Sequence, residues 1–95
     1  MKIAGREKIK EFAAKHSNTR SGLSRWLDVV EKCSWQTFSE LRKTFPSADY
    51  VKGQVVFNVA GNHVRLIALI DFDSRVILIK NVLRHEEYDE EKWKR

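Results

Sequence analysis

The apolar residues of this chain follow a helical spacing in its first half and a strand spacing in its second half. In residues 6–16 they recur three and four positions apart, with charged residues on the opposite side, as in an amphipathic helix. Residues 17–19 interrupt this pattern and are good N-cap residues for a second helix. Pro46 ends a third helix, because proline disfavours helical geometry at the preceding residue. The residues that these helices turn inward are Ile9, Phe12, Ala13, Leu23, Trp26, Leu27, Val30, Phe38, Leu41 and Phe45.

The second half of the chain is predicted to be an antiparallel meander. Residues 55–60, 63–71 and 76–84 are rich in Val, Ile and Phe, which favour strands. Residues 1–4 are expected to add an edge strand, and residues 46–53 to be a loop. The C-terminal residues suit a short helix that contacts the body through Tyr88 and Trp93. The expected fold is α+β in a single domain of residues 1–95, with the N-terminal helices on one face of a small, mainly antiparallel sheet.

The turns predict which strand residues lie opposite each other. Residues 61–62, Gly-Asn, form a favoured two-residue hairpin loop, and this loop places Asn58 opposite Arg65. We expect residues 73–74 to close the next hairpin in the same way. The resulting pairs are Ile67 with Lys80, Arg65 with Val82, and His63 with Arg84.

Because side chains alternate along a strand, these pairs sort the sheet into two faces. A mid-strand cation is solvated or meets an anion, so both a solvated outer face and a phosphate site stay open. An odd-numbered loop within residues 71–75 would move Lys80 and Arg84 to the other face. The polar face is expected to gather Asn58, His63, Arg65, Lys80 and Arg84. The core face is expected to carry Val55, Phe57, Val59, Val64, Leu66, Ala68, Ile70, Ile77, Ile79 and Leu83. Asn81 is the only polar residue expected on this face.

Composition narrows the class of protein. The chain has 95 residues, which suits one compact domain. It contains no run of 18 apolar residues, the length that a membrane-spanning helix needs. Its charged N-terminus lacks the apolar core of a secretory signal, so we expect a cytoplasmic location. Cys33 is the single cysteine, which excludes an internal disulfide framework and a thiolate metal cage built by one chain. The net charge of +5 favours a polyanion as partner, nucleic acid first.

Two segments of the predicted strands, each with polar residues among apolar ones, together resemble sequences of a known family. VFNVAGNHVRLIALI followed by VILIKNVLRHEEYD is similar to the HigB-type toxins of bacterial toxin–antitoxin systems, which belong to the RelE-like superfamily. In that family a VFNxxGNxxRLI strand precedes a segment of the form [KR]xVxTHxEYD. The helical first half and the Phe-Pro-Ser of residues 45–47 are similar as well. Arg84 departs from the pattern, because the family usually has Thr there.

The resemblance implies a function and a set of site residues. It implies a ribosome-dependent mRNA endonuclease that needs no metal or other cofactor and is held inactive by a HigA-like helix-turn-helix antitoxin. Operator DNA would be bound only through the antitoxin complex. RNA would bind on the side of the sheet opposite the helices. The expected catalytic residues are Arg65, Lys80, His85 and Tyr88, and the expected RNA-binding residues are Asn58, His63 and Arg84.

These residue types match the chemistry of RNA cleavage without a metal. Arg65 is the expected phosphate clamp, because its planar fork can hold two oxygens, with Lys80 as a second cation. Histidine changes charge near neutral pH, so His85 is the expected general base or acid. Tyr88 could stack on a base or donate its hydroxyl. Each of these residues also has a structural alternative. Arg65 could form an ion pair in the sheet, and Lys80 could be a surface lysine. His85 could be a corner histidine, and Tyr88 could anchor the last helix. The competing function is a non-catalytic basic module that binds RNA, the ribosome or a partner protein.

Overall fold

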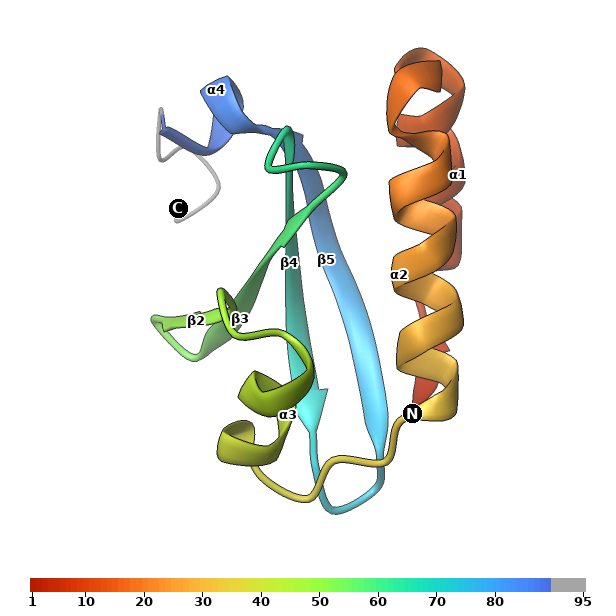
Figure 1. Cartoon of the computed structure of the whole chain (residues 1–95). Coiled ribbons are helices and arrows are strands. Elements are labelled where there is room, and N and C mark those ends of the chain that lie inside the picture. Colours follow the sequence, from red (N-terminus) through yellow and green to blue (C-terminus); the bar gives the residue numbers. More distant parts are fainter. Residues whose placement is uncertain (90–95) are drawn as a thin grey trace.

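The computed structural model of this chain describes residues 1–89 and combines helices with one sheet (Figure 1). Its elements are β1 (Lys2–Ala4), α1 (Arg6–Lys15), the 3₁₀ turn η1 (Ser17–Thr19), α2 (Arg20–Lys32), α3 (Phe38–Thr44), β2 (Asp49–Val51), β3 (Gln54–Val59), β4 (Val64–Asp71), β5 (Val76–Arg84) and α4 (His85–Asp89). The strand order is β1-β5-β4-β3-β2, and only β1 and β5 pair in parallel. The predicted α+β class and the edge strand near the N-terminus are confirmed. Trp93 lies outside the described residues.

The layers of the fold separate two surfaces. In Figure 1, α1 and α2 lie side by side against one face of the sheet, whereas α4 lies past the end of β5 on the other side. No helix within residues 1–89 has the length and apolar character needed to cross a membrane. The helix-covered face and the α4 side are therefore two separate surfaces of the molecule.

The core lies between the helices and one face of the sheet. Its buried members include Ile9, Phe12, Leu23, Trp26, Val30, Leu41, Val55, Phe57, Val64, Leu66, Ala68, Ile77 and Ile79. The ring of Phe57 meets the rings of Trp26 and Phe45 edge to face, each at a centroid distance of 5.2 Å. Fully burying a side chain of this kind stabilises the fold by about 1.5–3 kcal/mol. The predicted inward stripes of the three helices are confirmed.

The hairpin of β3 and β4 has the predicted register. Asn58 lies opposite Arg65, and the turn residues Gly61 and Asn62 have φ values of 62° and 75°. Positive φ at both central residues matches the twist of the flanking strands. The short turn thus sets which residue of β3 lies opposite Arg65.

Gly22 lets α2 pack closely against this turn. A Cβ atom at this position would lie 2.6 Å from the Cα atom of Ala60, which is closer than two non-bonded carbon atoms can approach. Since the contact is with backbone, a side chain here would have to displace the turn or the helix. The position of the turn therefore depends on glycine, which has no side chain, at position 22 of α2.

The strands β4 and β5 pair in two registers that a bulge separates. From Asp71 with Val76 to Ala68 with Ile79, the pairing follows the predicted register. Lys80 is then the extra residue of β5, because beyond it the pairs are Ile67 with Asn81, Leu66 with Val82, Arg65 with Leu83, and Val64 with Arg84. The predicted pairs of Ile67 with Lys80, Arg65 with Val82, and His63 with Arg84 are therefore wrong. One extra residue reverses the side of every residue that follows it.

The bulge corrects the prediction of the two faces. Val82, rather than Leu83, packs against the core, and Asn81 no longer has to lie on the core face. Arg84 comes opposite Val64, which is a core residue. The prediction that Arg84 shares the face of Arg65 is therefore wrong. The bulge turns Val82 inward and interrupts the regular pairing of β4 and β5, and this moves Arg84 to the opposite face.

The segment predicted as a loop contains a strand. In β2, Tyr50 lies opposite Val55 and Val51 lies opposite Gln54. Lys52 and Gly53 close this hairpin with φ values of 50° and 81°, in the manner of the turn between β3 and β4. The Lys-Gly pair between short strand segments was a signal for a hairpin that the loop prediction missed.

Candidate functional site

Arg65 is a buried cation at the start of β4, with only 8% of its surface exposed. Its Nη1 donates to the carbonyl oxygens of Asn62 at 2.9 Å and Val64 at 3.3 Å. Its Nη2 lies 2.9 Å from Nδ1 of His85. A guanidinium has five N–H groups, so two of them have no acceptor within residues 1–89. Two free N–H groups are what a two-point contact to a phosphate requires.

His85 connects Arg65 to a carboxylate. Because a guanidinium can only donate, Nδ1 of His85 is the acceptor in this contact. In the neutral ring the proton is then on Nε2, which lies 3.3 Å from Oδ2 of Asp89. The backbone N–H of His85 also donates to the carbonyl of His63 at 2.9 Å, which fixes the start of α4. The series Arg65, His85 and Asp89 thus selects one tautomer of the histidine.

Tyr88 completes this cluster on α4. Its ring centroid lies 5.8 Å from Cζ of Arg65, within the range of a cation–π contact worth about 0.5–2 kcal/mol. The structure thus brings together three of the four predicted catalytic residues, Arg65, His85 and Tyr88. It adds Asp89, which our sequence-based selection of site residues omitted. The signal was present, because Asp89 follows His85 by four residues and such pairs face each other on a helix.

Lys80 lies apart from the contacts of this cluster. As the bulged residue of β5 it is exposed, and within residues 1–89 its side chain makes no hydrogen bond or ion pair. It lines a cavity of about 290 Å³ between β5 and α1, together with Lys8 and Lys15. The expected catalytic role of Lys80 stays a prediction.

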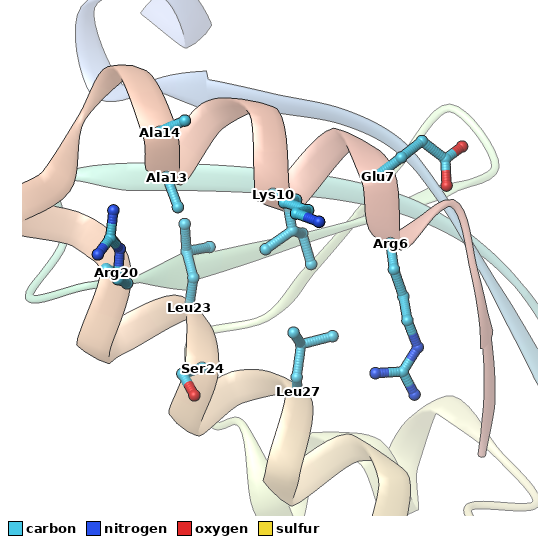
Figure 2. Close-up of a pocket in the computed structure, with 10 residues that line it drawn as sticks. Arg6, Glu7, Lys10, Ala13, Ala14, Arg20, Leu23, Ser24 and Leu27 are labelled. Carbon is cyan, nitrogen blue, oxygen red and sulfur yellow. The ribbon is translucent and has the colours of Figure 1, made fainter.

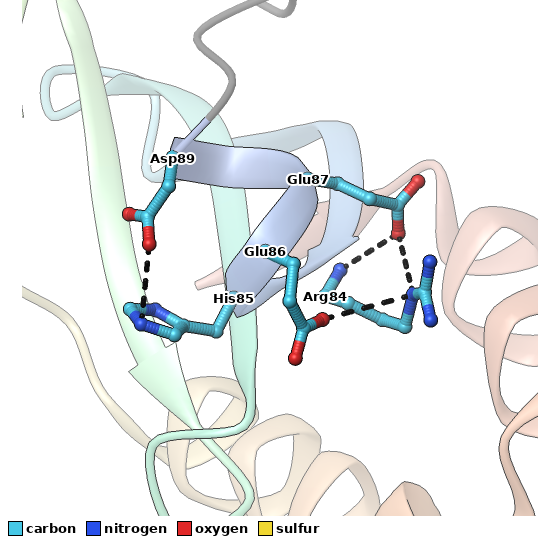
Figure 3. A network of polar contacts seen from close by, with 5 residues as sticks. All are labelled: Arg84, His85, Glu86, Glu87 and Asp89. Atoms are coloured by element: carbon cyan, nitrogen blue, oxygen red, sulfur yellow. Dashed lines mark hydrogen bonds and ion pairs between the residues drawn. The ribbon is translucent and has the colours of Figure 1, made fainter.

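Arg84 is neutralised by two glutamates. Its Nε lies 3.2 Å from Oε1 of Glu87 and 3.9 Å from Oε2 of Glu86. Its backbone N–H donates to the same Glu87 oxygen at 3.0 Å, and this bond is the main reason why the pKa of Glu87 is lowered. Figure 3 shows Arg84 and the glutamates on one side of α4, with His85 and Asp89 on the other. Arg84 is thus directed away from the Arg65 cluster.

The remaining predicted RNA-binding residues are divided between two places. Asn58 is exposed in β3 directly opposite Arg65, as predicted. His63 instead lines a cavity of about 160 Å³ with Arg84, His16 and other residues. The five polar residues therefore do not form the single patch that was predicted.

The chemistry that the Arg65 cluster can perform is proton transfer and stabilisation of negative charge. A buried, preorganised cation acts most strongly on charge that develops during a reaction, and a histidine with a fixed tautomer can take or give a proton. Within residues 1–89 no group of three or more His, Cys, Asp or Glu side chains could hold a metal ion. A buried cation beside a histidine suits an anionic substrate such as a phosphodiester.

Comparison with known proteins assigns this chain to a family. A family model described as HigB_toxin, RelE-like toxic component of a toxin-antitoxin system, matches residues 19–91. The mRNA interferase toxin HigB of Escherichia coli (strain K12) is 30% identical over 92 residues, covering 94% of this chain and 88% of that protein. The mRNA interferase HigB of Shigella flexneri matches to the same extent. That of a second Escherichia coli strain is 32% identical, covering 94% and 89%. The resemblance found in the sequence is confirmed.

Proposed function

This chain belongs to the HigB family of RelE-like toxins, the toxic components of toxin–antitoxin systems, and we propose that it is a ribosome-dependent mRNA endoribonuclease that inhibits translation. Its relatives are named mRNA interferase HigB. The single observation that carries the proposal is the contact of Arg65 with His85, which joins the two polar segments of the sequence at one site. The proposed partner is a HigA-like helix-turn-helix antitoxin, through which alone operator DNA is bound. Cleavage is proposed to take place in the cytoplasm and to use side chains only.

The proposed reaction is attack of a ribose 2′-hydroxyl on the adjacent phosphorus. The bond between the 2′-oxygen and phosphorus forms, and the bond from phosphorus to the 5′-oxygen breaks. The products are a 2′,3′-cyclic phosphate and a 5′-hydroxyl end. One protein group takes the proton of the 2′-hydroxyl, and another gives a proton to the departing 5′-oxygen. Such positioned acid–base groups contribute about 10²–10⁴-fold to the rate.

Arg65 is the proposed phosphate clamp. Its contacts to two backbone carbonyls hold the guanidinium in place before the substrate arrives, and the two N–H groups that have no acceptor within residues 1–89 could contact phosphate oxygens. Because the side chain is buried, its charge is screened less by solvent than a surface charge would be. Removing one preorganised donor of this kind typically costs about 10²–10³-fold in rate.

His85 is the proposed proton carrier. In the structure both ring nitrogens are engaged, Nδ1 by Arg65 and Nε2 by Asp89, so one contact must open before His85 can exchange a proton with RNA. If Nη2 of Arg65 donates to a phosphate oxygen instead, while Nη1 keeps its contacts to the two carbonyls, Nδ1 loses its donor and becomes a free acceptor. Substrate binding would thus activate the base. Tyr88, close to both groups, is proposed to stack on a nucleobase or to donate its hydroxyl.

The test is to map mRNA 5′ ends in a translating extract, with and without ribosomes. Arg65→Lys keeps the positive charge but loses the planar fork, and we expect it to reduce cleavage about 10²–10³-fold. Arg42→Lys is the matched control, because Arg42 donates to the carbonyl of Pro46 in the loop after α3. Ends that cluster at one codon position only with ribosomes would support the proposal. If the wild-type chain cuts no mRNA, the proposal fails and a non-catalytic basic binding module is favoured.

A further inference from the structure

A cavity lies where α2 meets the turn between β3 and β4. Its volume is about 260 Å³, slightly below the roughly 300–1,000 Å³ of sites that hold drug-sized ligands, so it suits a single small group. Beyond Val56, β3 pairs with no strand on its β2 side within residues 1–89, and the cavity lies at this open edge of the sheet. The residues that line it include Gly22, Arg25, Trp26, Phe45, Asn58 and Gly61.

Trp26 brings an unused hydrogen-bond donor to this cavity. Its side chain is buried, and its Nε1 is the only buried side-chain nitrogen or oxygen of residues 1–89 that has no hydrogen-bond partner there. In contrast, Nε1 of Trp35 donates to Oγ1 of Thr44 at 3.1 Å. An indole N–H can only donate, and a buried donor without an acceptor is unfavourable. An occupant that satisfies Trp26 must therefore offer an acceptor.

The other groups around the cavity suit a nucleotide. Arg25 is exposed, and its side chain makes no ion pair or hydrogen bond within the described part of the chain, so it is available to a phosphate. Phe45 adds an aromatic ring, on which a base can stack. Asn58 adds a side-chain amide, which both donates and accepts. A flat base with acceptors on its edge, joined to a phosphate, matches these groups together.

The turn between β3 and β4 connects the cavity to Arg65. Gly61 lines the cavity, and the carbonyl of the next residue, Asn62, accepts a hydrogen bond from Nη1 of Arg65. Asn58, which also lines the cavity, lies opposite Arg65, and neighbouring strands are about 4.7–4.9 Å apart. An RNA strand whose phosphate contacts Arg65 therefore has its next nucleotide within reach of the cavity.

We infer that this cavity holds the base of a nucleotide next to the phosphate that Arg65 binds. Nε1 of Trp26 donates to an acceptor on that base, and Arg25 contacts the RNA backbone. The inference rests on the proposed function, and it makes Trp26 and Arg25 determinants of which mRNA sites are cut. An acidic peptide would satisfy Arg25, but it offers no flat ring to Phe45. Inorganic phosphate lacks such a ring as well.

The first test follows the indole N–H signals of the full chain by ¹H–¹⁵N NMR while 2′-O-methyl RNA trinucleotides of each base are added. The 2′-O-methyl group blocks the attacking hydroxyl, so binding is measured without cleavage. At least one trinucleotide is expected to shift the Trp26 signal, which is assigned from its loss in Trp26→Phe. The Trp35 signal is the internal control, because its N–H already donates to Thr44.

Three outcomes of this titration would overturn the inference. The first is an unchanged Trp26 signal while backbone amides around Arg65 shift, since RNA would then bind without using the cavity. The second is an equal shift of the Trp26 signal with inorganic phosphate, which would exclude recognition of a base. The third is a shift with a glutamate-rich peptide and none with RNA, which would point to a protein partner.

The second test compares two charge variants in α2. Arg25→Gln is expected to weaken binding of the trinucleotide about 2–10-fold and to reduce its salt dependence by about one phosphate contact. Arg20→Gln makes the same charge change in the same helix, but Arg20 lines the groove between α1 and α2 instead (Figure 2). It is expected to change the affinity far less. An equal loss in both variants would assign the effect to net charge and overturn the role of Arg25.

Trp26→Phe tests the donor itself. It keeps an aromatic ring beside Phe57 and removes the N–H, so we expect it to change which mRNA sites are cut in a translating extract. An unchanged choice of sites in a variant that circular dichroism shows to be folded would overturn the inference. If the variant does not fold, the wild-type indole signal and the two arginine variants still decide. A wild type whose Trp26 signal shifts with RNA but which cuts no mRNA would count against the proposed function alone.

Discussion

The α4 side and the α1–α2 side of this chain differ in what holds them together. On the α4 side, Arg65 is buried and held by directional hydrogen bonds to two carbonyls and to His85. On the α1–α2 side, an apolar groove has charges only at its rim, and Lys10 and Arg20 are unpaired there within residues 1–89. A hydrogen-bonded cluster depends on atomic positions, whereas an apolar groove depends on area and net charge. Single substitutions should therefore affect the first region far more than the second.

The two regions meet at the turn between β3 and β4. Gly22 of α2 packs against Ala60 at the start of this turn, and the carbonyl of Asn62 in the same turn accepts a hydrogen bond from Arg65. A change in how α2 packs can thus reach the Arg65 cluster through two contacts. Substitutions in either region can therefore show how far the two are independent.

The largest expected effect is that of His85→Ala. Loss of the proposed proton carrier should reduce mRNA cleavage about 10²–10⁴-fold, while the midpoint of thermal unfolding changes little because the His85 side chain is 47% exposed. The measurement is the initial rate of appearance of new mRNA 5′ ends in a translating extract. His16→Ala is the control, because His16 is a histidine at the end of α1. Equal loss of cleavage in both variants would contradict the role of His85, and a clearly lower unfolding midpoint of His85→Ala would assign its loss of cleavage to folding.

Part of the site could be predicted because it depends on local geometry. The turn at residues 61–62 sets the register of one hairpin, so Asn58 was correctly placed opposite Arg65. The proximity of His85 and Tyr88 to Arg65 came only from the family resemblance, since no turn rule connects residues so far apart in the sequence. In the fold, periodicity identified the inward residues of the helices and the core face of β3 and β4, but it placed Leu83 instead of Val82 against the core.

The bulge at Lys80 could not be predicted from the turns. It is set by the core, which accepts Val82 but not Asn81, and turn residues carry no information about that choice. Asn81 on the predicted core face was the sign that the regular ladder was wrong. Arg84 was misplaced for the same reason, because its side of the sheet depends on whether β5 has an extra residue.

Gly22→Ala tests the contact that joins the two regions, and its effect should be smaller. Alanine favours a helix by about 1 kcal/mol over glycine, but the added Cβ would lie 2.6 Å from Cα of Ala60. Because the clash is with backbone, we expect a net loss of about 1–3 kcal/mol in the free energy of unfolding, measured by urea denaturation. Ser21→Ala, an exposed neighbour in α2, is the control and should change stability little. A more stable Gly22→Ala variant would show that α2 and the turn are not tightly packed.

The smallest expected effect is that of Glu87→Gln, on the side of α4 that faces away from the Arg65 cluster. The backbone N–H of Arg84 holds the pKa of Glu87 below its ordinary value of 4.5, and the Arg84 guanidinium adds to this. The carboxylate therefore stabilises the fold above about pH 4.5, and this contribution is lost as the pH falls through the lowered pKa.

We expect Glu87→Gln to flatten the dependence of the free energy of unfolding on pH below about pH 4.5. At neutral pH the cost should be under about 1 kcal/mol, because the side chain is 43% exposed. Urea unfolding at a series of pH values measures both effects. Glu86→Gln is the matched control, since its carboxylate lies 3.9 Å from Nε of Arg84 and accepts no backbone hydrogen bond within residues 1–89. An equally flat curve for Glu86→Gln would assign the effect to net charge instead of to the bond from Arg84. Reduced cleavage in Glu87→Gln would mean that the two sides of α4 are coupled.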